Sequence, residues 1–104
     1  MTRIIAILML ALLCACTWVK PTAEGAKVNV AAADAVSACE NLGKVSVSLK
    51  HEVARVERSA EKVAGELETL ARNEGALMGG DTVSPQSKVT EGRQEFGVYR
   101  CGKG

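Results

Sequence analysis

The chain has 104 residues, 47% of them hydrophobic, with only one Trp, one Tyr and one Phe. Its 13 basic and 12 acidic side chains give a formal net charge of +1 without a basic stripe, so nucleic-acid binding has no electrostatic support. So short a chain with so few aromatic residues builds a small and marginal core.

The first 15 residues have the order of a signal peptide. Arg3 supplies a positive charge, residues 4–13 are an unbroken apolar run, and small residues precede the polar sequence that begins at Thr17. The run is shorter than the roughly 20 residues of a membrane-spanning helix. A buried N-terminal helix is the alternative, which the lack of a polar side disfavours. We expect residues 1–15 to be removed, which leaves 12 basic and 12 acidic side chains.

The end of this segment resembles the lipobox of bacterial lipoproteins, since it reads Leu13-Cys14-Ala15-Cys16. The resemblance implies cleavage between Ala15 and Cys16 and a diacylglyceryl group on the Cys16 thiol. If Cys14 were the acceptor, the bulky Leu13 would have to fill a protease pocket for small residues. A metal site is disfavoured because zinc takes about four ligands and no others lie near. Two or more acyl chains give stable anchoring, so we expect a membrane-held protein.

The residue after the lipidated cysteine bears on location. Lipoproteins kept at the inner membrane typically carry Asp there, whereas this chain has Thr17. The resemblance therefore implies an outer-membrane protein that faces the periplasm and is attached through the lipid on Cys16. Trp18 comes next, and its amphipathic ring suits either the headgroup level of the membrane or a plain tether.

Two cysteines remain, Cys39 and Cys101, and an even remainder in an exported chain predicts a disulfide. Two independent buried thiols are the alternative. A bond over a loop of roughly 60 residues would stabilise the fold by about 4 kcal/mol in the chain-entropy model. A redox function for the pair is disfavoured because redox cysteines usually lie close together, as in C-x-x-C.

The N-terminal part of the mature chain predicts short elements. Residues 16–25 contain a proline and a glycine and predict a lipidated tether, and residues 26–104 predict a small α+β domain. Residues 26–31 alternate enough to predict a short strand. Residues 34–43 begin with an Asp N-cap and end with glycine, which predicts a helix of one or two turns.

The middle of the chain has the strongest periodic patterns. Residues 44–50 predict a strand with one buried face, because Val45, Val47 and Leu49 alternate with polar residues. Residues 58–78 predict a long helix, because apolar residues recur at spacings of three and four. Its small residues predict a patch where a sheet comes close, and they are Ala64, Gly65, Ala71 and Gly75.

The C-terminal part predicts a strand over residues 81–84, a polar loop over 84–92 and a last strand over 94–101. This order indicates an α+β fold with one long helix on a small, mostly antiparallel sheet of three or four strands. A disulfide needs Cα atoms about 4.4–6.8 Å apart, so we expect residues 94–101 to pair with 44–50 and to have 81–84 on the other side. The helix should cover Phe96 and Val98, with Tyr99 and Cys101 facing away.

Five sequence blocks together resemble the small bacterial lipoproteins of the domain of unknown function 4156 family. They are CTWVK (16–20), C-E-x-L-G-K-V-x-V (39–47), E-K-V-A-x-E-L-E-T-L-A-R-N-E (61–74), GGDTV (79–83) and FGVYRC (96–101). Membership implies a periplasmic lipoprotein of uncharacterised function and adds no active site. The chain resembles more distantly, at the level of fold, the outer-membrane sensor lipoprotein of the Rcs phosphorelay. That sensor has two disulfides, whereas this chain can form only one.

No pattern in the sequence predicts catalysis. His51 is the only histidine, and no Cys, Ser or Asp arrangement surrounds it, so we expect a surface residue. The carboxylates of the long helix predict a solvated face rather than an acid–base pair. We therefore expect a non-enzymatic protein without metal, cofactor or nucleic acid, which binds an envelope partner or acts in stress sensing. The alternative is a thiol-based periplasmic redox protein that uses Cys39 and Cys101.

Overall fold

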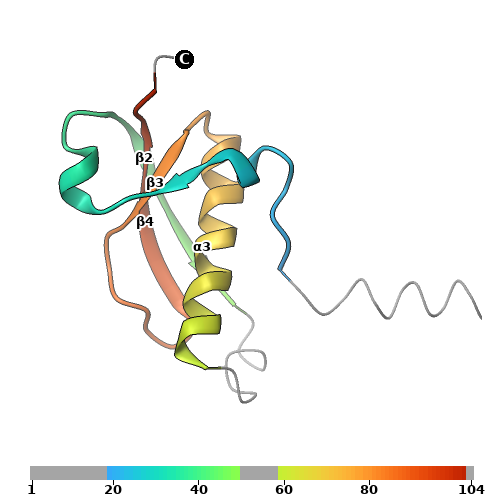
Figure 1. Cartoon of the computed structure of the whole chain (residues 1–104). Coiled ribbons are helices and arrows are strands. Elements are labelled where there is room, and N and C mark those ends of the chain that lie inside the picture. Colours follow the sequence, from blue (N-terminus) through green and yellow to red (C-terminus); the bar gives the residue numbers. More distant parts are fainter. Residues whose placement is uncertain (1–18, 50–58, 103–104) are drawn as a thin grey trace, which may run out of the picture.

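A computed structural model describes residues 19–49 and 59–102, and these form two layers, a sheet and one long helix (Figure 1). The predicted α+β class is confirmed. The elements are the short 3₁₀ helices η1 (Gly25–Lys27) and η2 (Ala33–Val36), the helix α3 (Ala60–Leu77), and the strands β1 (Asn29–Val30), β2 (Glu40–Ser48), β3 (Thr82–Pro85) and β4 (Arg93–Arg100).

The sheet has the strand order β1-β3-β4-β2. The strand β1 is parallel to β3, and β4 is antiparallel to both β3 and β2. This confirms the predicted arrangement, in which the last strand lies between the strand predicted at 44–50 and the strand predicted at 81–84. Val45 is opposite Phe96, and Val98 is opposite both Val83 and Gly43. The apolar side chains of the three strands therefore share one face.

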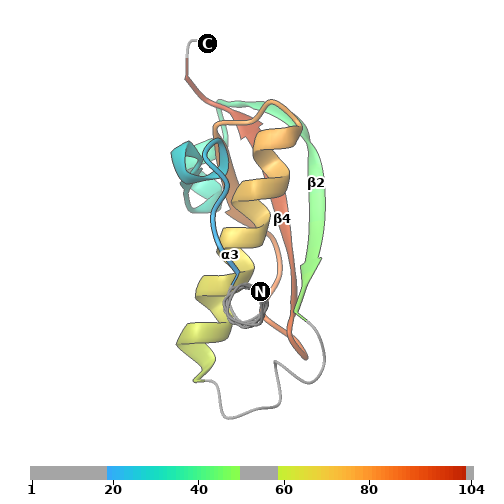
Figure 2. The same ribbon diagram turned by 90° about the vertical axis from the view of Figure 1, so that its right-hand side faces the viewer.

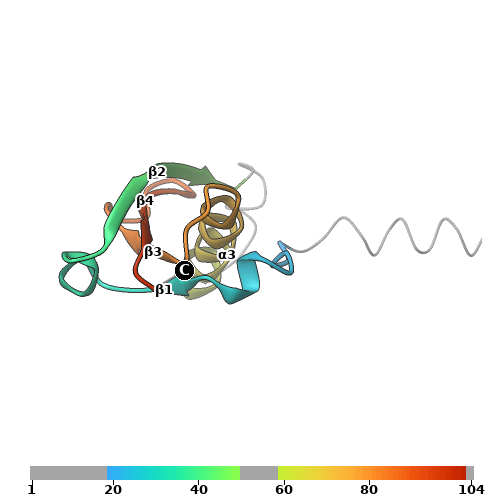
Figure 3. The same cartoon turned by 90° about the horizontal axis from the view of Figure 1, so that it is seen from above.

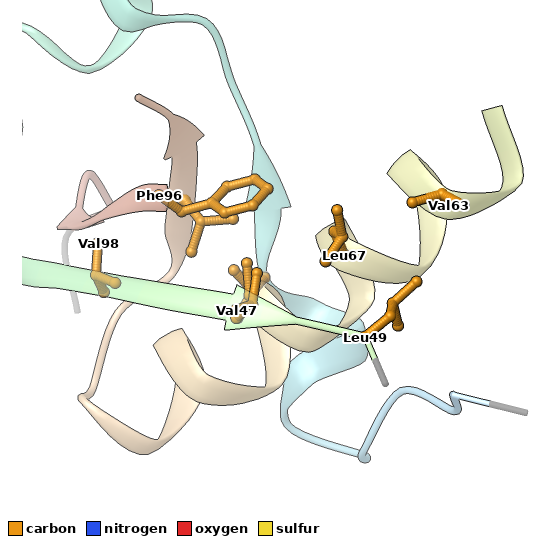
Figure 4. Close-up of a cluster of buried hydrophobic side chains, with 9 residues drawn as sticks. Val47, Leu49, Val63, Leu67, Phe96 and Val98 are labelled. Carbon is orange, nitrogen blue, oxygen red and sulfur yellow. The ribbon is translucent and has the colours of Figure 1, made fainter. Parts of the chain in front are cut away.

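The helix α3 covers that face (Figures 2 and 3). Ser59 caps its start, because the side chain accepts a hydrogen bond of 3.1 Å from the backbone N–H of Lys62. Figure 4 shows Val47, Phe96 and Leu67 gathered between sheet and helix. Leu67, Ala71, Val83, Phe96 and Val98 are fully buried. Burial of a side chain such as Leu or Phe contributes about 1.5–3 kcal/mol, so this cluster is the main source of stability.

The predicted bounds of three local elements are wrong. The predicted helix over 34–43 is only the single turn η2, and β2 begins at Glu40 rather than at residue 44. The reason is Gly43, which has φ +135° at a register shift in the pairing of β2 with β4. A glycine in such a conformation marks a β-bulge, whereas the sequence indicated a helix end. The predicted strand over 26–31 is also reduced, to Asn29–Val30 after the turn η1.

The face of the sheet opposite α3 is partly covered by residues 31–39, which connect the two outer strands β1 and β2 (Figure 3). Val36 in η2 is buried, and η2 lies against β3. Thr82 and Ser84 of β3 point to this side and are almost fully buried, and Tyr99 lies opposite Thr82. The predicted outward direction of Tyr99 is therefore confirmed.

Candidate functional site

The predicted disulfide between Cys39 and Cys101 is present, with Cα atoms 4.6 Å apart. Cys39 directly precedes β2, and Cys101 directly follows β4. Because these strands are antiparallel, the bond joins the start of one strand to the end of its neighbour. The bond lies at the end of the sheet, outside the core cluster beneath α3, as the sequence predicted. It closes a sequence separation of 62 residues.

The carboxylate of Asp81 holds the chain around Cys101. Its Oδ1 accepts from the backbone N–H of Cys101 at 2.8 Å, and its Oδ2 accepts from the N–H of Gly102 at 2.7 Å. The hydroxyl of Thr82 donates to Oδ1 at 2.9 Å. The two backbone bonds are the main reason that the pKa of Asp81 is lowered from its ordinary value of 3.8, with smaller help from Thr82 and the charge of Arg100.

The groups around the disulfide bear on whether it could be redox-active. A redox-active thiolate is stabilised by a helix N-terminus or a nearby cation. Here the N–H of Cys39 donates to the carbonyl of Val36 at the end of η2, and Cys101 lies beside the negative charge of Asp81. Arg100, which directly precedes Cys101, is a cation, but its guanidinium forms an ion pair of 3.1 Å with Glu40. The described groups around the bond therefore do not favour a thiolate.

A second feature is the attachment of the N-terminal segment to α3 by two adjacent helix residues. Asn73 donates from Nδ2 to the carbonyl of Lys20 at 3.0 Å and accepts at Oδ1 from the N–H of Thr22 at 2.9 Å. Arg72 donates to the carbonyls of Val28 and Ala26, each at 2.9 Å. Two neighbouring side chains therefore hold the backbone of residues 20–28 along the helix.

Close packing supports these hydrogen bonds. Gly25 is buried, and a Cβ atom added there would collide with the Oδ1 of Asn73 and lie 3.0 Å from the Asn73 Cα. Val19, the first described residue, packs against the core cluster. The residues from Val19 to Gly25 fall within the segment that the sequence predicts to be a tether, and they lie against the helix instead of extending away from it (Figure 2).

Sequence reasoning missed the role of Arg72 and Asn73. Helical spacing places Arg72 on the polar side of α3, which indicated only a solvated face. No local pattern shows that its guanidinium reaches backbone carbonyls 44 and 46 residues away. The one available signal was their place inside the block at 61–74 that carries the family resemblance.

The face of the sheet opposite α3 carries a shallow hollow of about 430 Å³ beside the loop between β3 and β4. Its lining is polar and carries both signs of charge, with Ser46, Arg93 and Glu95 from the strands and Ser87, Lys88 and Glu91 from the loop. Ser46 is opposite Glu95 in the sheet. The hollow therefore presents hydroxyl groups and both charges to the solvent.

Other predicted residues are not placed. Ala15, Cys16, Trp18 and His51 lie outside the described residues. Within residues 19–49 and 59–102, no cluster of three or more His, Cys, Asp or Glu side chains is arranged to hold a metal ion. None of the helices in the same ranges is both long and apolar enough to cross a membrane.

The fold and the site define a small disulfide-closed α+β domain whose N-terminal segment is attached to its helix. The chain belongs to the family described as Domain of unknown function (DUF4156), which matches residues 19–101. This confirms the family that the sequence blocks indicated, and the match begins at the first described residue. Comparisons with curated proteins and with solved structures gave no match.

Proposed function

We propose that this chain is a lipid-anchored bacterial envelope protein that acts by binding a partner rather than by catalysis. In this proposal residues 1–15 direct export, the bond between Ala15 and Cys16 is cleaved, and acyl chains on Cys16 hold the protein on the membrane. Thr17 after the acceptor directs it to the outer membrane.

The observation that carries the proposal is the Cys39–Cys101 disulfide. Stable disulfides are characteristic of oxidising compartments such as the bacterial periplasm and are rare in the cytosol. An export signal and a disulfide-closed domain therefore point independently to the same compartment. The two remaining cysteines, Cys14 and Cys16, fall in the signal segment and at its end.

A binding role is supported by the surface of the domain. The polar hollow around Ser46, Arg93 and Glu95 is open to the solvent and offers donors, acceptors and both charges. Such a surface suits a polar envelope partner, either another protein, the peptidoglycan or a component of a stress-sensing cascade. The thiol redox alternative is less well supported, because the described surroundings of the disulfide do not stabilise a thiolate.

Metabolic labelling with a clickable fatty acid in intact cells tests the anchor. The parent protein and Cys14→Ala should both incorporate the label, whereas Cys16→Ala should lose it and accumulate as the precursor. Retention of label in Cys16→Ala, or its loss only in Cys14→Ala, would contradict the assignment.

Photo-crosslinking in intact cells tests the binding role. A photoreactive residue at Ser46, inside the hollow, should give a discrete crosslinked product. The same residue at Ala35, which is exposed in η2 and does not line the hollow, is the matched control. No product at Ser46, or equal products at both positions, would contradict a partner at the hollow.

A further inference from the structure

The attachment of residues 19–28 to α3 fixes how far the domain can lie from its anchor. Asn73 and Arg72 hold this segment, and Val19, the first described residue, packs against the core. The acceptor cysteine of the proposed function is Cys16, only three residues earlier. Three extended residues span at most about 11 Å.

This length is short compared with the domain. With 18 residues, α3 is about 27 Å long. A connection of about 11 Å cannot let a body of that size turn freely above a membrane. If the segment were a flexible tether up to Ala26, ten residues would separate the domain from Cys16, and the reach would be about 35 Å.

We propose that the domain is held directly against the lipid headgroups, with the exposed side of α3 and residues 19–25 toward the membrane. This inference rests on the proposed lipidation of Cys16. Figures 1 and 3 show the N-terminal segment on the α3 side of the molecule, away from η2 and from the connection between the outer strands. The hollow at Ser46 and Glu95 lies on the opposite face and points into the periplasm.

Two labelling positions distinguish the two faces. Gly65 lies on the exposed side of α3, and a Cβ atom there meets nothing within 4 Å. Ser46 is exposed on the opposite face of the sheet. Gly65→Cys and Ser46→Cys therefore each accept a thiol-reactive fluorophore, because Cys39 and Cys101 are joined and Cys16 is lipidated in this proposal.

The experiment uses the full-length protein purified from membranes and inserted into vesicles of phosphatidylethanolamine and phosphatidylglycerol. A fraction of the lipid carries a nitroxide quencher on its headgroup. We expect the Gly65→Cys label to be quenched several-fold more strongly than the Ser46→Cys label. Ten Gly and Ser residues inserted between Trp18 and Val19 should remove this difference. Equal quenching of the two labels without the insertion, or an unchanged difference with it, would overturn the inference.

A second pair of variants tests the attachment itself. Asn73→Ala removes the hydrogen bonds to Lys20 and Thr22 and should reduce the difference between the two labels. Glu74→Ala, at the adjacent exposed position of α3, is the matched control and should leave the difference unchanged. A response of both variants alike, or of neither, would contradict the role of Asn73.

The proposed lipidation of Cys16 and the proposed orientation of the domain can be contradicted separately. The mass of the N-terminal peptide from the same preparation reports whether Cys16 is acylated. An unacylated protein contradicts the proposed function, whereas an acylated protein with equal quenching contradicts only the orientation.

Discussion

Two glycines of α3 should respond to the same substitution with opposite signs. Gly65 is exposed in the middle of the helix, and a Cβ atom there meets no heavy atom within 4 Å. Gly75 is buried against the sheet, and its Cβ atom would lie 2.8 Å from Cγ1 of Val83 and 3.6 Å from Cγ1 of Val98. Val83 and Val98 are themselves fully buried, so neither side chain has free space into which it can move.

The size of each effect follows from these contacts. Gly65→Ala gains helix propensity only, which should raise the free energy of unfolding by about 1 kcal/mol. Gly75→Ala gains less helix propensity, because Gly75 lies in the last turn of α3. It also adds a methyl group to a packed core, which costs about 1–3 kcal/mol of stability. The net result should be a loss of about 1 kcal/mol.

Thermal unfolding followed by circular dichroism on the purified protein measures both variants. A change of 1 kcal/mol shifts the midpoint of a domain of this size by roughly 4–8 °C, so the midpoint should rise for Gly65→Ala and fall for Gly75→Ala. An equal rise for both variants would show that α3 does not approach the sheet at Gly75 as closely as the structure has it.

Three further changes test the disulfide, the Asp81 carboxylate and the membrane location. Cys39→Ser and Cys101→Ser should each lower the thermal midpoint by roughly 15–30 °C, from about 4 kcal/mol of loop-closure entropy, and a double variant that is clearly less stable than either single one would contradict a shared bond. The pKa of Asp81 is lower in the folded state than in the unfolded state. The ionised carboxylate therefore stabilises the fold fully at a pH above its unfolded pKa, and this stabilisation is lost as the pH falls through the folded pKa. Asp81→Asn should therefore lower the midpoint at pH 7 and flatten its fall below about pH 4, and unchanged profiles in acid titrations would count against this link. Thr17→Asp should retain the protein in the inner membrane, as measured by fractionation on a sucrose gradient. A parent protein found in the inner-membrane fractions would contradict the predicted outer-membrane location.

The sequence predicted the elements whose patterns are long and regular. The helix followed from apolar residues at helical spacing, and it differs from the prediction over 58–78 by only a few residues. The alternation at Val45 and Val47 identified the buried face of β2. The strand order followed from a covalent constraint, since a bond between Cys39 and Cys101 is compatible with antiparallel neighbours.

The remaining features depend on contacts that no local pattern contains. Gly43 indicated a helix end, because a glycine with positive φ terminates helices and forms bulges alike, and only the pairing with β4 decides between them. The attachment of residues 20–28 depends on two polar side chains of α3 and on backbone carbonyls far away in the sequence. Polar residues on a helix surface have the same pattern whether they face solvent or another segment.

Mass spectrometry of the N-terminal peptide from protein purified out of bacterial membranes is the decisive test of the proposed lipid anchor. We expect the mature chain to begin at Cys16 and this residue to carry the mass of a diacylglyceryl group, with a further acyl chain on its amino group. A peptide that still contains Ala15, or one that begins at an unmodified Cys16, would contradict it.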